Sequence, residues 1–238
     1  DQEDARYIGL TLPRVVGRLP YGANTLPVET FNFEEEIEES TDGRGYLWIN
    51  AAYELAGRLV SSFEESGWCA AIRGVEGGGL VNSLPIHNYI SSSGEKLSQC
   101  PTEVAISDRR EKELSDLGFI PLVHCKGTDY AAFFAVPSIN KPRKYNSDAA
   151  NANAHLSSQL PYILTMSRFA HYLKVMVRDK IGSFMSRDEC ENFLQTWINQ
   201  YVVTSDTASA EVKAMHPLRE ARVDVIEVPG VPGMYKAV

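Results

Sequence analysis

Apolar residues recur every three or four positions in three long segments of the chain, and this spacing predicts amphipathic helices. Signals at the ends of the segments support the prediction. Gly67 can close the first helix in a left-handed conformation, and Pro161 suits the first turn of the second. Ser186 and Glu189 form a capping box at the start of the third. The three segments are residues 46–66, 160–182 and 186–202.

Short apolar runs bounded by glycines or turn residues predict buried strands. Cys69–Val75 is the first, Phe119–Cys125 follows a short helix that begins at Asp108, and Tyr130–Val136 comes next. Residues 87–99 are polar and are predicted to form a loop. Strands that alternate with helices indicate an α/β (α+β) fold, in which a mixed sheet is flanked by helices.

Two further strands are predicted at the C-terminal end, Val223–Val228 and Met234–Val238. The composition suggests three parts. They are an N-terminal arm and loop at 1–45, an α/β core at 46–140, and a helical segment with a C-terminal β-arm that packs on the same core at 141–238.

The composition is that of a globular protein, and its charge limits the classes of partner. Of the 238 residues 44% are hydrophobic, and the net charge of −8 argues against a general nucleic-acid binder. The acidic run Glu34–Glu39 is most simply a solvated loop. The four cysteines have no zinc-type spacing, so we predict reduced thiols and no metal site; they are Cys69, Cys100, Cys125 and Cys190.

Two patterns leave an enzyme open as the alternative. The glycines from Gly74 to Gly79 invite a phosphate-binding interpretation, but Leu80 stands where a phosphate loop needs its lysine. His124 and Cys125 could form a base and a thiol nucleophile, but neighbours in a strand point to opposite faces. The alternative is a nucleotide-binding or cysteine-dependent hydrolase, and we predict no catalytic residue and no cofactor.

The second long helix carries charged residues on the face opposite its apolar stripe. Such a face is usually solvated, but it could dock an acidic partner. A second basic cluster, Lys141–Tyr145, is expected to be exposed surface. The charged residues of the helix are Arg168, Lys174, Arg178, Asp179 and Lys180.

Five long motifs resemble one protein family. From Tyr7 to the last residue the chain looks like the C-terminal half of the large sheath subunit of the bacterial type VI secretion system, the TssC or VipB family. The motifs are LTLPRVVGRLPYG, YLWINAAYELAGRL, GWCAAIRGVEGGGLV, DRREKELSDLGFIPLVHCKGTDYAAFF and SRFAHYLKVMVRDKIGSF.

The resemblance implies a structural protein with a fold like that of phage tail sheaths. It implies a bacterial cytoplasmic polymer, formed by copies of the chain with the small sheath subunit (TssB or VipA) around a tube of Hcp. The polymer would stand on a baseplate, contract to expel the tube, and be recycled by the AAA+ unfoldase ClpV. Neither nucleic acid nor membrane insertion is expected.

Two hypotheses about contact residues follow from the resemblance. The predicted C-terminal strands would pair with strands of neighbouring subunits, so a proline at Val225 would block sheath formation and leave the domain folded. The charged face of the second long helix, from Arg168 to Lys180, or the capping-box helix after it, would lie towards the tube. The residues predicted for strand pairing are Val223, Val225, Val228, Met234, Tyr235 and Val238.

Overall fold

The computed structural model describes residues 3–30, 32–37, 45–90, 93–180, 186–205, 207–229 and 235–238. The helices are the 3-10 turn η1 (Glu3–Tyr7), α1 (Ala52–Ser66), α2 (Asp108–Asp116), α3 (Asp148–Leu156), α4 (Leu160–Asp179), α5 (Arg187–Asn199) and α6 (Ala210–Met215). The strands are β1 (Leu10–Leu12), β2 (Arg14–Val16), β3 (Trp48–Asn50), β4 (Leu80–Val81), β5 (Asn88–Ile90), β6 (Lys96–Ser98), β7 (Phe119–His124), β8 (Ala131–Phe133), β9 (Val225–Glu227) and β10 (Tyr235–Ala237).

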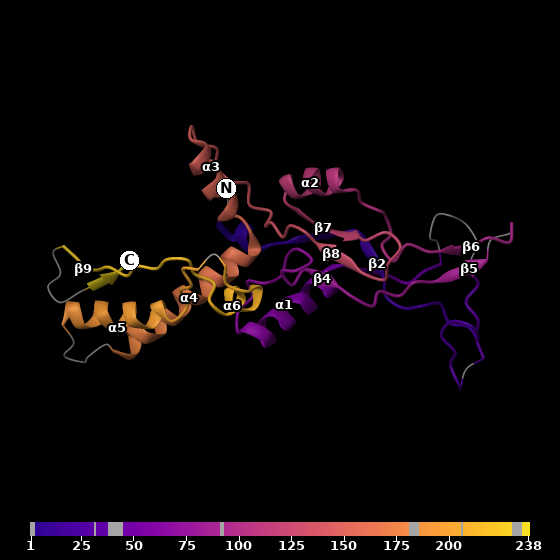
Figure 1. Cartoon of the computed structure of the whole chain (residues 1–238), viewed down its shortest axis with the longest axis horizontal. Coiled ribbons are helices and arrows are strands. Elements are labelled where there is room, and N and C mark those ends of the chain that lie inside the picture. The colour runs from indigo at the N-terminus through magenta and orange to yellow at the C-terminus, as the bar shows by residue number, and fades with distance from the viewer. Residues whose placement is uncertain are drawn as a thin grey trace.

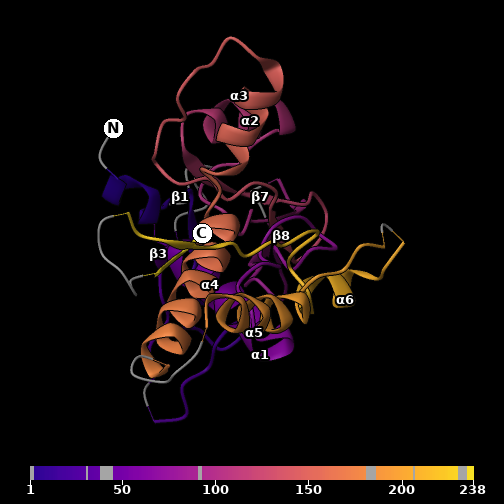
Figure 2. The same ribbon diagram turned by 90° about the vertical axis from the view of Figure 1, so that its left-hand side faces the viewer.

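The predicted mixed sheet flanked by helices is confirmed. Its order is β1-β7-β8-β4, with β1 parallel to β7 and the other pairs antiparallel. Figures 1 and 2 place α2 and α1 on opposite sides of this sheet. Its core contains side chains with no exposed surface from β7 and β8, including Ile120, Leu122 and Phe133. The apolar runs that predicted these two strands therefore mark the centre of the fold.

The glycine-rich stretch is not the strand that its composition predicts. Residues 69–79 form bends and turns, and the strand that follows, β4, has only two residues. Gly74 N–H donates to the carbonyl of Phe133 (2.7 Å), and Gly79 N–H donates to the carbonyl of Gly74 (2.9 Å). Ile72 is nevertheless fully buried. The apolar pattern therefore predicted the burial of this stretch correctly. It did not predict the backbone conformation, because glycine turns replace the regular hydrogen bonding of a strand.

Two other predictions need correction. Residues 87–99 are not a plain loop, because β5 and β6 pair there as an antiparallel hairpin around Gly94, whose φ is +81°. The start of the first predicted helix is instead β3, which pairs with β2, and α1 begins only at Ala52. Gly67 does close α1 in the left-handed conformation, with φ +76°.

A second cluster of buried side chains joins α4, α5 and the C-terminal segment. The ring of Trp68 stacks on Phe169 of α4 with centroids 4.4 Å apart. Leu194 and Ile198 of α5 complete the cluster from the other helix. The capping box predicted at Ser186 is present, with its hydroxyl accepting from the N–H of Glu189. The predicted helix end at 181–182 lies outside the described residues.

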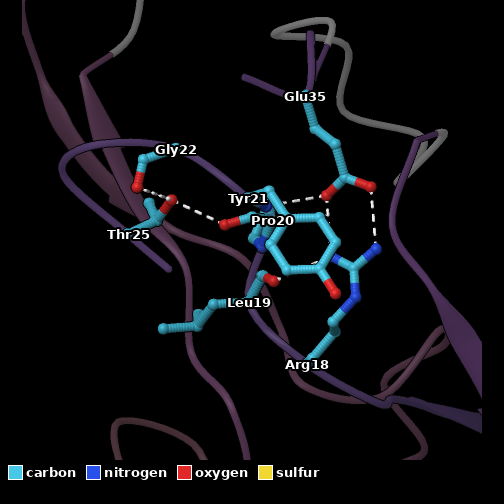
Figure 3. Close-up of polar contacts among 7 residues, drawn as sticks. All are labelled: Arg18, Leu19, Pro20, Tyr21, Gly22, Thr25 and Glu35. Carbon is cyan, nitrogen blue, oxygen red and sulfur yellow. Dashed lines mark hydrogen bonds and ion pairs between the residues drawn. The ribbon is translucent and has the colours of Figure 1, made fainter. Parts of the chain in front are cut away.

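An ion pair closes the loop that follows β2 (Figure 3). The guanidinium of Arg18 donates to both carboxylate oxygens of Glu35, at 2.7 and 2.8 Å, and stacks 3.8 Å from the ring of Tyr21. The N–H of Tyr21 also donates to Glu35 (2.8 Å). These bonds, the one from Arg18 first, lower the pKa of Glu35 to about 2. This loop lies at the end of the molecule away from α5 (Figure 1).

Candidate assembly interface

The C-terminal strands β9 and β10 form a two-stranded hairpin anchored at its base. Val225 is 2% exposed, and its N–H donates to the carboxylate of Glu191 on α5 (3.0 Å). The N–H of Val223 donates to the side chain of Gln195, also on α5 (2.8 Å). Two side chains of α5, Glu191 and Gln195, therefore anchor the hairpin by accepting hydrogen bonds from its backbone.

The outer edge of β10 is open. Asp224 and Val238 exchange both backbone hydrogen bonds, at 3.0 and 2.9 Å. Because bonded and non-bonded pairs alternate in an antiparallel ladder, Tyr235 and Ala237 direct their backbone N–H and C=O groups away from β9. Within the described part of the chain the sheet has no third strand. The opposite edge, on β9, is partly occupied by Glu191.

The residues predicted for strand pairing divide into two groups. Val223 and Val225 are buried anchors that pack on α4 and α5. Tyr235 and Val238 are 45% and 65% exposed and lie in or beside β10. Val228 follows β9 and is half-buried, and Met234 is outside the described residues.

The contacts of Val225 argue against one part of the predicted effect of proline there, that the domain stays folded. Proline would remove the N–H that Glu191 accepts and would disturb a side chain in the buried cluster. The domain itself would be damaged, so this substitution cannot separate folding from assembly.

An apolar groove of about 690 Å³ runs between α4 and the C-terminal segment. Ala237 and Val238 border it on one side, so it adjoins the open edge of β10. Lys174 and Arg178 border it on α4. Its apolar lining comes from Phe169, Leu173, Val177, Ile198 and Leu218, among others.

The charged residues that were predicted to face a partner differ in their surroundings. Arg168 is half-buried, and its guanidinium donates to the carbonyl of Gly67. Two of its nitrogens also donate to the hydroxyl of Tyr172, at 2.7 and 3.0 Å. Lys180, beyond the end of α4, lies 5.1 Å from the ring centroid of Phe193. Lys174, Arg178 and Asp179 are exposed and stay available to a partner.

The structure does not form the base and nucleophile pair, His124 and Cys125, that the enzyme alternative would need. His124 Nε2 lies 2.8 Å from the carbonyl of Thr128, and its Nδ1 lies 3.5 Å from the thiol of Cys100 instead of Cys125. Burial, with a smaller effect of Asp108, raises the pKa of the Cys125 thiol, which disfavours a thiolate nucleophile. Sequence reasoning missed the contact with Cys100 because 24 positions separate the two residues.

Among the described residues no group of three or more histidine, cysteine, aspartate or glutamate side chains could hold a metal ion. No helix in the described ranges combines the length and apolar character needed to cross a bilayer.

Comparison with known proteins places the chain in a family. Residues 1–140 match the family described as EvpB/VC_A0108, tail sheath N-terminal domain, and residues 149–238 match EvpB/VC_A0108, tail sheath gpW/gp25-like domain. The type VI secretion system sheath protein TssC1 of Pseudomonas aeruginosa PAO1 is 52% identical over all 238 residues. The chain spans 48% of the length of that relative. The chain therefore belongs to the EvpB/VC_A0108 tail sheath family.

Proposed function

We propose that this chain is the polymer-forming part of a contractile sheath subunit of a type VI secretion system, with a mechanical role and no catalysis. Family membership and the identity with a sheath protein support the proposal. The observation that carries it is the open outer edge of β10, on a hairpin whose base is fixed to α5 by Gln195 and Glu191.

An open edge of this kind suits a link between rigid subunits. A two-stranded hairpin is marginally stable alone, and an added strand supplies main-chain hydrogen bonds without requiring large side-chain pockets. A five-residue strand adds about four or five hydrogen bonds, each contributing roughly 1 kcal/mol net. Such a link holds neighbouring subunits together while each subunit rotates as a body.

The partners in this proposal are those of a sheath. The added strand comes from the small sheath subunit (TssB or VipA) or from another copy of this chain. The polymer surrounds an Hcp tube on a baseplate in the bacterial cytoplasm, and ClpV recycles it. The exposed charges near the end of α4 face the tube, so Arg178→Glu with Lys180→Glu should weaken tube association at low salt.

The test uses proline on the open edge instead of in the anchor. The N–H of Ala237 faces away from β9, so Ala237→Pro removes a donor that only an incoming strand would use. Ala237→Ser is the matched control, because it keeps the N–H. Both variants are made in the full-length protein, which is co-expressed with the small sheath subunit and examined by electron microscopy.

The expected result is filaments from wild type and Ala237→Ser, and none from Ala237→Pro. The circular dichroism spectra should be the same for all three. Normal filaments from Ala237→Pro would overturn strand addition at this edge.

A further inference from the structure

A second hollow lies away from the C-terminal hairpin. It has a volume of about 820 Å³ and is bounded by η1, the segment 140–145, α3 and the first turns of α4. Figure 2 shows η1 beside α4 and α3 above it. We name it the basic groove, after the three cations in its lining, Arg6, Lys141 and Arg143.

The charge of the basic groove opposes that of the whole molecule. The chain carries a net charge of −8, yet no aspartate or glutamate lines the groove. Among the described residues, Arg6, Lys141 and Arg143 form no ion pair. Three unneutralised cations around one hollow create a local positive potential that favours an anionic occupant.

The walls of the basic groove also expose aromatic surface. Tyr7, Tyr145 and Tyr162 are 60%, 50% and 47% exposed, and the buried Ile163 lies in the lining between them. Tyrosine and arginine are enriched in the binding centres of protein interfaces. A simple inorganic anion would leave these rings unused, so the surface fits a peptide that carries both carboxylates and an apolar side chain.

The segment 140–145, which carries Lys141 and Arg143, is held by hydrogen bonds at both ends. The N–H of Ile139 donates to the carbonyl of Ile8 (3.0 Å). At the other end, Asn151 on α3 accepts from the N–H of Tyr145 (2.7 Å) and donates to its carbonyl (3.0 Å). Because the segment is already ordered, a ligand would bind without the entropic cost of ordering it.

The chain carries a peptide of matching chemistry. Residues 32–37, NFEEEI, place the exposed carboxylates of Glu34 and Glu36 beside Phe33, which is also exposed. Glu35, between these two residues, is bonded to Arg18, and this ion pair holds the stretch in place (Figure 3). The side chains of Glu34 and Glu36 remain exposed to solvent. We name residues 32–37 the acidic stretch.

The acidic stretch cannot reach the basic groove of its own molecule. Figure 1 places the loop after β2 at one end of the long axis, and η1 and α3 in the other half. We propose that the basic groove binds the acidic stretch of a neighbouring copy of this chain. Because the two surfaces differ and lie in different halves of the molecule, the contact can repeat head-to-tail along a polymer.

This inference rests on the proposed function, because the sheath polymer is what brings copies of the chain together. Its test does not require an assembled sheath. The probe is a fluorescein-labelled NFEEEI peptide, and its anisotropy is titrated with the protein at low salt. Wild type should bind the peptide, and Arg6→Glu with Arg143→Glu should weaken binding at least about tenfold. Lys112→Glu with Lys126→Glu is the matched control, because it makes the same charge change elsewhere and should bind like wild type.

Exchanging the charges of the peptide and the groove gives a more specific test. The peptide NFKEKI should not bind wild type but should bind the Arg6→Glu, Arg143→Glu variant. Absence of peptide binding, equal loss in the Lys112→Glu, Lys126→Glu control, or tighter binding of inorganic phosphate or single-stranded DNA would each overturn the proposal. The Ala237→Pro variant should still bind the peptide. The groove contact and strand addition at β10 are therefore tested independently, and either proposal can fail while the other holds.

Discussion

The guanidinium of Arg168 on α4 donates to the carbonyl of Gly67, the residue that caps α1 and lies 101 positions earlier in the chain. The same group lies 4.6 Å from the ring centroid of Phe63 and 5.0 Å from that of Trp68. One side chain thus binds the end of α1 to α4.

Arg168→Ala should therefore destabilise the fold. It removes charge-assisted hydrogen bonds and ring contacts together, so the free energy of unfolding should fall by about 2–3 kcal/mol in urea titrations. Arg178→Ala, on the exposed part of the same helix, should change it by less than about 0.5 kcal/mol. Equal effects of the two substitutions would show that Arg168 is a surface charge, as the sequence pattern first indicated.

The pair of Arg18 and Glu35 predicts a dependence of stability on pH. The pKa of Glu35 is lowered from 4.5 to about 2 in the folded state, chiefly by the hydrogen bond from Arg18. A lowered folded pKa means that its stabilisation is complete above about pH 4.5 and is lost as the pH falls towards 2.

Glu35→Gln should lower the free energy of unfolding at pH 7 by about 1–2 kcal/mol. Urea titrations of both proteins at several pH values between 7 and 3 measure the difference, which should shrink below pH 4.5. A difference that stays constant, or grows as the pH falls, would contradict the assigned pair.

Two glycines should respond to alanine in opposite directions. A Cβ on Gly79 would lie 2.5 Å from the carbonyl oxygen of Phe133, whereas a Cβ on Gly57 in α1 would meet nothing within 4 Å. Gly79→Ala should cost about 1–3 kcal/mol through overpacking, and Gly57→Ala should stabilise the helix by about 0.5–1 kcal/mol. Thermal unfolding of both variants measures the effects, and a neutral Gly79→Ala would show that the turn tolerates a side chain.

The cysteines should differ in reactivity. Since a carbonyl can only accept, Nε2 of His124 donates its N–H to Thr128, and Nδ1 can accept a hydrogen bond from the thiol of Cys100. Burial raises the pKa of the Cys69 and Cys125 thiols, which keeps both protonated. Cys100 should therefore react with iodoacetamide before Cys69 and Cys125.

Mass spectrometry of the timed reaction measures the order. His124→Ala should slow Cys100 several-fold and leave Cys190 unchanged as the internal control. The assigned contact would be wrong if Cys100 kept its rate in the variant.

The sequence predicted the elements with long or strongly apolar patterns. The helices α4 and α5 were expected because their apolar residues recur at helical spacing, and the strand β7 was expected because it is a short continuous apolar run. The stretch at 69–75 was predicted as a strand because its side chains are apolar, but hydrogen bonds to Gly74 and Gly79 set its path.

The contacts of the candidate site were beyond sequence reasoning for a different reason. Val225 and Tyr235 look alike as apolar strand residues, yet one anchors on α5 and the other lies exposed on the open-edged strand. Arg168 resembled its charged neighbours, and only the fold brings it to Gly67. Local patterns give burial and period, whereas pairing between distant segments depends on tertiary packing.

The most direct measurement of the central claim is an electron cryomicroscopy map of the polymer that the full-length protein forms with the small sheath subunit. The account predicts a strand from another polypeptide alongside β10, about 4.8 Å from it and hydrogen-bonded to the backbone of Tyr235 and Ala237. An outer edge of β10 that is left in solvent, or covered by a strand of its own chain, would contradict it.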